Sequence, residues 1–184
     1  MQRINALDPA ASPAASKTIL DAIQKKIGMV PNFFKTLAHA PAGLKFYTQQ
    51  VETLTGGVLS PGLREQLAIA VAASNGCDYC ASAHTLMGKG AGLNPTELAS
   101  SLNGHSENTK VQAALVFAKE IVRSRGHLTN EQFDAVRRAG YSDAEVVEII
   151  AHVGMNTFTN YFNNLAKTTI DFPHVSTSAT ALTA

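Results

Sequence analysis

Three side chains capable of redox chemistry lie in one short stretch of the sequence. Cys77, Cys80 and His84 are spaced i, i+3 and i+7, so on a helix they project from one narrow stripe. Cys80 and His84 form an i, i+4 pair, which brings a thiol within contact reach of a base. We therefore expect His84 to be the proton partner of Cys80.

The position of Cys77 suggests a second route to a reactive thiolate. Asn75 and Gly76 tolerate φ > 0 and mark a corner between two helices, so Cys77 falls in the first turn of the second helix. Unpaired backbone N–H groups and the helix dipole lower a thiol pKa there. This argument makes Cys77 the more acidic sulfur and the one exposed to a reductant, whereas the contact with His84 favours Cys80.

A carboxylate on the preceding helix could complete the group. Glu65 comes just before an apolar run, residues 67–72. If the corner folds the two helices together, Glu65 would hold and polarise His84 as the orienting acid of a thiol, base and acid arrangement. The alternative is a solvated carboxylate near a helix start, where acidic residues are favoured in any case.

The composition excludes several classes of function. The chain has 184 residues and a net charge of +1, which gives no electrostatic argument for nucleic acid or an anionic membrane. We find neither an apolar stretch of 18 residues nor an export signal, so we expect a cytoplasmic protein that does not enter membranes. In that compartment a CxxC pair indicates redox or metal chemistry rather than a structural disulfide.

Prolines, glycines and capping residues divide the chain into helices. We expect an irregular N-terminal arm over 1–15, one helical domain over 16–173 and a disordered Ser/Thr/Ala-rich tail over 174–184. Capping boxes are predicted at Asn94–Glu97 and Ser142–Glu145. No stretch has the alternation of a strand, so the predicted fold class is all-α. The expected helices cover about 16–26, 32–40, 41–54, 61–74, 77–89, 95–102, 110–125, 130–139 and 143–167.

A zinc site is the main alternative to redox chemistry at the cysteines. A closed zinc site needs four ligands, and the stretch supplies only three in Cys77, Cys80 and His84. The sequence contains no second Cys/His cluster. We therefore favour redox chemistry and expect neither a metal nor a cofactor.

Candidate pocket residues lie near the cysteines and on the last helix. Tyr79 is expected to pack at the site wall, with hydrogen-bond donation as an alternative. His152, Asn156, Asn160 and Asn163 form a polar stripe on a largely apolar helix. Such a stripe more often faces solvent or another subunit. The sharper alternative places it in the pocket, and we keep Tyr79, His152 and Asn156 as the candidate pocket residues.

The combination of Glu65, the CxxC pair and His84 resembles the alkylhydroperoxidase D core of the carboxymuconolactone decarboxylase superfamily. The segments VPNFFKTLAHAP and NTFTNYFNNLAKTTIDFP are similar to its peroxidase-related branch, and the likeness extends from about Ile27 to Pro173. One position departs from the mycobacterial-type enzymes, which have a His where this chain has Tyr79.

The resemblance implies an all-α homo-oligomer that reduces hydroperoxides through a disulfide cycle. Cys80 would match the cysteine that attacks peroxide, Cys77 the resolving cysteine, and Glu65 with His84 the proton relay. An external dithiol, either a lipoyl group or a thioredoxin-like protein, would reduce the disulfide. The alternatives are a decarboxylase-like enzyme, whose branch does not use the CxxC pair, and a non-catalytic helical oligomer that responds to redox state.

Overall fold

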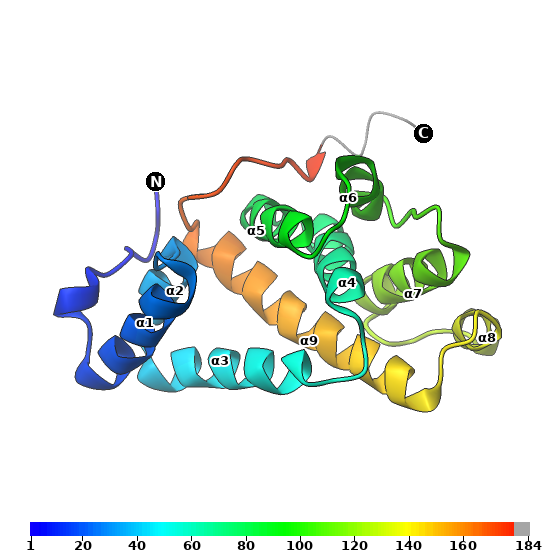
Figure 1. Ribbon diagram of the computed structural model, residues 1–184, viewed down its shortest axis with the longest axis horizontal. Helices are drawn as coiled ribbons and strands as arrows, with labels where there is room; N and C mark the ends of the chain where they lie inside the picture. Colours follow the sequence, from blue (N-terminus) through cyan, green and yellow to red (C-terminus); the bar gives the residue numbers. More distant parts are fainter. Residues whose placement is uncertain (179–184) are drawn as a thin grey trace.

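The computed structural model describes residues 1–178, and within that range it contains helices and no strand, as the sequence predicts. The helices are joined by short loops (Figure 1). They are η1 Pro9–Ala11, α1 Ala14–Ile27, α2 Asn32–Leu37, α3 Pro41–Thr55, α4 Pro61–Ser74, α5 Asp78–Gly90, α6 Pro95–Leu102, α7 Thr109–Ser124, α8 Asn130–Arg138 and α9 Asp143–Ala166.

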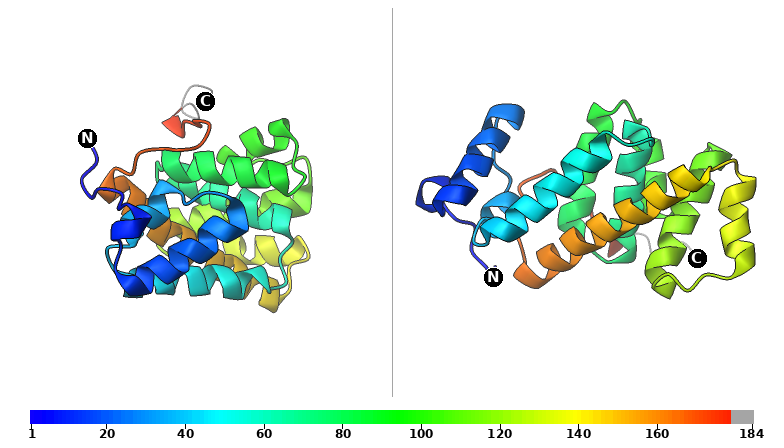
Figure 2. Two further views of the ribbon diagram at one scale, coloured as in Figure 1. Left: turned by 60° about the vertical axis from the view of Figure 1, so that its left-hand side comes forward. Right: turned by 90° about the horizontal axis from the view of Figure 1, so that it is seen from below.

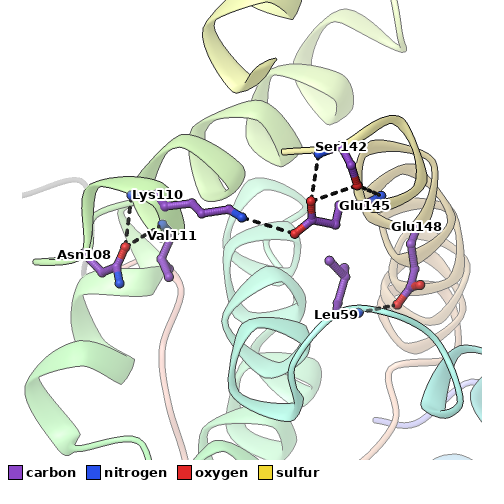
Figure 3. A network of polar contacts seen from close by, with 7 residues as sticks. All are labelled: Leu59, Asn108, Lys110, Val111, Ser142, Glu145 and Glu148. Carbon is purple, nitrogen blue, oxygen red and sulfur yellow. Dashed lines mark hydrogen bonds and ion pairs between the residues drawn. The ribbon is translucent and has the colours of Figure 1, made fainter. Parts of the chain in front are cut away.

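Helix starts follow the capping residues in the sequence. The predicted capping box of α9 is confirmed, because Ser142 and Glu145 satisfy each other's backbone N–H groups (Figure 3). At α6, Asn94 caps the helix by accepting from the N–H of Glu97, but the predicted return bond is wrong. The Glu97 carboxylate instead accepts from Gln66 on α4, so the cap also joins two helices.

Helix α4 lies at the centre of the fold and packs against α5, α6, α7 and α9 (Figure 1). Its residues from Gln66 to Ala72 are all buried. A helix surrounded on all sides has no solvent-facing stripe, which explains why this run lacks the usual alternation of polar and apolar positions. Glu65, at the edge of this run, is positioned by a helix held on several sides.

The apolar core forms two clusters on either side of α4. One joins α4 to α7, α8 and the first half of α9 and includes Leu67, Leu115 and Ile149. The other joins α1, α2, α3 and α5 and includes both cysteines. Helix α9 runs past both clusters (Figures 1 and 2), so residues spaced along it can contact the two regions. The dithiol is therefore part of a core and not of a surface loop.

A carboxylate on α9 holds the loop that leads into α4. Glu148 accepts hydrogen bonds from the backbone N–H groups of Val58 and Leu59, at 2.6 and 3.0 Å (Figure 3 draws the second). Gly57 leaves room for this contact, because a Cβ atom at that position would collide with the Glu148 carboxylate. The loop and α9 thus fix where α4 begins.

The N-terminal arm is more ordered than its sequence suggests. It contains η1, and α1 begins at Ala14, before the predicted boundary. The backbone N–H of Arg3 donates to the carbonyl of Ala166 at 2.7 Å. This bond satisfies a carbonyl left unpaired at the end of α9, which is the physical reason that the arm is held in place.

The expected disorder of the tail is wrong for residues 174–178. This segment runs over α5 (Figure 1), where the N–H of Val175 donates to Ser82 and that of Thr177 to Asp78. Low apolar content suggested disorder, but hydrogen bonds to polar groups on α5 hold the segment instead. The rest of the predicted tail, 179–184, lies outside the described residues.

Candidate active site

The corner between α4 and α5 places the two sulfurs together. Gly76 has φ of 62°, the left-handed conformation that glycine adopts without strain, whereas Asn75 has an ordinary negative φ. Cys77 follows as the N-cap of α5, and its Sγ accepts from the N–H of Cys80 at 3.4 Å. Both thiols are free, and their sulfurs are 2.9 Å apart. This separation lets a disulfide form with little backbone movement.

The predicted pairing of Glu65 with His84 is present in the structure. The corner brings α4 and α5 into extensive contact, and His84 Nδ1 lies 2.8 Å from Glu65 Oε2. A carboxylate at Nδ1 requires Nδ1 to carry a proton, so Nε2 is left for other work. Burial alone lowers the pKa of His84, but the charge of Glu65 and its hydrogen bond raise that pKa overall.

The two sulfurs are not activated as the helix dipole suggested. The Cys77 thiol donates to Cys80, and this bond together with burial raises the pKa of Cys77. Burial also acts to raise the pKa of Cys80, but the bond from Cys77, the charge of His84 and two amides lower it to about 6. Cys80 is therefore the thiolate, because it receives hydrogen bonds while Cys77 gives one away.

The expectation that Cys77 faces a reductant is also wrong. Cys77 has no exposed surface and Cys80 has 3%. Because Cys77 is the N-cap, its side chain folds back over the first turn and into the cluster formed with α1, α2 and α3. A shallow cleft of about 240 Å³ opens beside this turn, between Gly76–Tyr79 and Asn163–Ile170.

The polar stripe on α9 is buried, so the expected solvent or subunit face is wrong. His152, Asn156, Asn160 and Asn163 are each at most 4% exposed. Asn163 Nδ2 donates to Cys80 Sγ at 3.4 Å, which brings the stripe to the dithiol. The reason is topological: α9 passes directly behind α5, so the face that looked free in sequence is covered.

The two candidate pocket residues of this stripe have different surroundings. Asn156 donates to the carbonyl of His152 on its own helix at 2.8 Å. His152 Nε2 is buried without a hydrogen-bond partner in the part of the chain that the structure describes, and lies 3.9 Å from Glu148. Burial lowers the pKa of His152, which sits within the electrostatic reach of Glu65 and His84. Neither side chain contacts a sulfur.

Tyr79 ties three segments together. Its hydroxyl accepts from the N–H of Phe33 at 3.0 Å and donates to Asp171 at 2.9 Å. Asp171 also accepts from the N–H of Asn32, at the start of α2. Burial raises the pKa of Tyr79, so the hydroxyl remains protonated. With both contacts made, Tyr79 serves as a structural link rather than as a replacement for a base between the cysteines.

Tyr47 is a site residue that the sequence did not reveal. It lies on α3, packs edge-on against Phe33 with ring centroids 4.9 Å apart, and belongs to the shell of the cluster that holds the sulfurs. Burial raises its pKa, and the charges of Cys80 and Glu65 raise it further. In the sequence it occupies an ordinary apolar position of an amphipathic helix, so no signal distinguished it.

Residues 1–178 contain no cluster of three or more His, Cys, Asp or Glu side chains arranged to hold a metal ion. Within the same range, no helix combines the length and the apolar character needed to cross a membrane.

Comparisons with known proteins agree with this arrangement. The chain matches the model of the carboxymuconolactone decarboxylase family over residues 38–122. A comparison with curated proteins found no significant match.

Several solved structures share the fold. The alkylhydroperoxidase AhpD core of a peroxidase-related protein from Ralstonia eutropha JMP134 is 25% identical, covers 92% of both chains and has a TM-score of 0.83. A peroxidase-related protein from Silicibacter sp. TM1040 is 22% identical, covers 91% of this chain and 92% of its own, and has a TM-score of 0.79. The debrominase Bmp8, bound to 2,3,4-tribromopyrrole, is 21% identical, covers 97% and 95%, and has a TM-score of 0.78. With these matches around a buried CxxC pair, the chain belongs to the carboxymuconolactone decarboxylase family and has the alkylhydroperoxidase D-like fold.

Proposed function

We propose that the protein is a dithiol peroxidase that reduces organic hydroperoxides or hydrogen peroxide through a Cys77–Cys80 disulfide. The observation that carries the proposal is a pair of free thiols 2.9 Å apart, in which Cys80 has a pKa of about 6. At neutral pH Cys80 is then mostly thiolate, the form that attacks peroxides. The likeness to the peroxidase-related protein from Ralstonia eutropha supports this choice.

The first half-reaction uses Cys80 and His84. The Cys80 thiolate attacks the terminal oxygen of the hydroperoxide, so an S–O bond forms and the O–O bond breaks. The electron pair of that bond leaves with the alkoxide. Protonated His84, whose pKa is raised by Glu65, supplies the proton that converts the alkoxide to an alcohol. Cys80 becomes a sulfenic acid, and the peroxide is reduced by two electrons.

The second half-reaction uses the short distance between the sulfurs. Cys77 attacks the sulfur of the sulfenic acid, an S–S bond forms and the S–O bond breaks. The departing hydroxide takes the proton of the Cys77 thiol and leaves as water. An external dithiol then restores both thiols by exchange and is itself oxidised. We propose a lipoyl group or a thioredoxin-like protein of the cytoplasm for this role, approaching at the Gly76–Tyr79 turn.

A homo-oligomer is part of the proposal. The outer face of α9 carries apolar side chains that are about half exposed or more, at spacings that keep them on one side of the helix. They are Val147, Ile150, Tyr161 and Leu165. A second copy of the chain would bury such a stripe. Tyr161→Glu should lower the mass measured by light scattering, and an unchanged mass would place any interface elsewhere.

Two alternative functions make different predictions. A decarboxylase-like enzyme of the same family would be indifferent to alkylation of Cys77 and Cys80. A non-catalytic oligomer that responds to redox state would form the disulfide without turnover. The debrominase among the fold relatives makes 2,3,4-tribromopyrrole a useful comparison substrate, since loss of bromide with disulfide formation would show thiolate attack on a halogen.

The test is to mix the reduced protein with cumene hydroperoxide or hydrogen peroxide, follow peroxide loss by stopped flow and identify the cysteine products by mass spectrometry. We expect one Cys77–Cys80 disulfide for each peroxide consumed. Cys80→Ser should abolish sulfenic acid formation, and Cys77→Ser should let it accumulate. Thiols that stay reduced in excess peroxide would refute the proposal.

A further inference from the structure

The sulfur of Cys80 faces a pair of buried amides on α9. Asn163 Nδ2 donates to Cys80 Sγ at 3.4 Å. Asn160 lies three positions earlier on the same helix, and therefore on the same face one turn away. Both side chains are at least 96% buried, by relative exposures of 0% and 4%. A negative charge at this sulfur is thus met by amide NH₂ groups rather than by water.

The orientation of Asn160 is fixed from the corner of the site. Its Oδ1 accepts from Asn75 Nδ2 at 3.0 Å, and the carbonyl of Asn75 accepts from Asn164 at 2.9 Å. With the carbonyl of Asn160 committed, its NH₂ group must point the other way. The residue that ends α4, immediately before the CxxC pair, therefore aims an amide on α9.

The NH₂ group of Asn160 has no hydrogen-bond partner within the described part of the chain, although its nitrogen is fully buried. An unpaired buried donor is costly and uncommon, so its presence beside a nucleophile calls for an explanation. Peroxide cleavage supplies one, because negative charge moves from the sulfur to the departing oxygen. A donor with no partner at rest can stabilise that oxygen without breaking another bond.

We propose that Asn163 and Asn160 form the anion site of the reaction. Asn163 holds the Cys80 thiolate, and the free NH₂ of Asn160 donates to the oxygen that leaves when the O–O bond breaks. This site supplies the stabilisation that a base between the cysteines would otherwise give, since Tyr79 is occupied by Phe33 and Asp171. The role of Asn160 rests on the proposed peroxidase function, whereas the role of Asn163 does not.

The first measurement is a titration of Cys80 that needs no peroxide. Thiolate absorbance is followed against pH in Asn163→Ala and Asn163→Asp, with Asn156→Ala as the matched control. Asn156 is equally buried on α9 but donates to its own helix backbone.

Loss of a hydrogen bond to a charged group should raise the pKa of Cys80 by about 1 to 2 units in Asn163→Ala. Asn163→Asp keeps the shape of the side chain and should raise that pKa as much or more. The groups that also face Cys80, namely Cys77, His84, Tyr47 and Tyr79, are unchanged in all variants. An unmoved titration in both Asn163 variants, or an equal shift in Asn156→Ala, would overturn the thiolate site.

The second measurement isolates Asn160. Asn160→Asp keeps the oxygen that accepts from Asn75 and removes the free NH₂. At a pH where Cys80 is fully ionised, iodoacetamide alkylation should be within about twofold of the parent protein, since a carbon electrophile has no departing oxygen. Peroxide consumption should fall on the order of tenfold to a hundredfold.

Equal effects on both reactions would overturn the role of Asn160. Absence of peroxide consumption in the parent protein would refute the peroxidase function, and with it the role of Asn160, while leaving the titration of Asn163 interpretable.

Discussion

Replacing Glu65 with Gln should uncouple His84 from Cys80. Gln preserves the shape of the side chain and removes the charge that faces His84 Nδ1 at 2.8 Å. The side chains of His84 and Glu65 are 13% and 21% exposed, so the bond is only partly screened by water. A hydrogen bond to a charged group in such a setting contributes about 1.5–3 kcal/mol, which corresponds to about 1 to 2 pKa units.

The pKa of His84 should therefore fall by about 1 to 2 units in Glu65→Gln. With less positive charge on His84, the pKa of Cys80 should rise, because that charge is one of the groups that lower it. The assay is an NMR titration of His84, assigned with His84→Gln, together with a thiolate absorbance titration of Cys80.

Glu120→Gln is the control for this experiment. Glu120 bonds to Arg123 on the exposed side of α7 and has no part in the dithiol site. It should leave both titrations unchanged. If His84 in Glu65→Gln titrates as in the parent protein, the assignment of Glu65 as the orienting acid is refuted.

Three further predictions follow from the same geometry. The folded-state pKa of Cys80, about 6, lies below the ordinary value of 9.0, so its contribution is fully present above pH 9 and is lost as pH falls through 6; relative to Cys80→Ser, the free energy of unfolding should rise by about 4 kcal/mol over that window in urea titrations. Gly57→Ala should lower the free energy of unfolding by about 1–3 kcal/mol, because its Cβ collides with Glu148, whereas Gly90→Ala, which meets open space, should not. Tyr79→Phe removes the hydroxyl shared by two partners and should lower the free energy of unfolding by about 1–3 kcal/mol while leaving the thiolate titration of Cys80 nearly unchanged; a large shift in that titration would mean that Tyr79 acts on the sulfur.

Local signals made most of the fold predictable from the sequence. Ser142 with Glu145 and Ser60 with Pro61 mark helix starts through bonds that span three or four residues, and such bonds depend little on the rest of the chain. The same holds for the Gly76 corner and for the stripe shared by Cys77, Cys80 and His84.

Errors arose where a distant segment changed the surroundings of a residue. The segment 174–178 looked disordered by composition, but its backbone N–H groups find acceptors in Ser82 and Asp78. The α9 stripe looked exposed, because the sequence does not reveal that α9 passes behind α5. Tyr47 looked like any core aromatic, since its neighbours at the site come from other helices.

The sequence by itself determined the chemical groups and their spacing: two thiols one helical turn apart, a base one turn further on, and a carboxylate on the preceding helix. Spacing is a property of the local helix and needs no tertiary contact. Only the tertiary structure decided which sulfur carries the charge. The dipole at the start of α5 favoured Cys77, but Cys77 gives its proton to a hydrogen bond with Cys80. Cys80 is stabilised by amides from α9 and by His84, and the helix packing alone brings Asn163 to its sulfur.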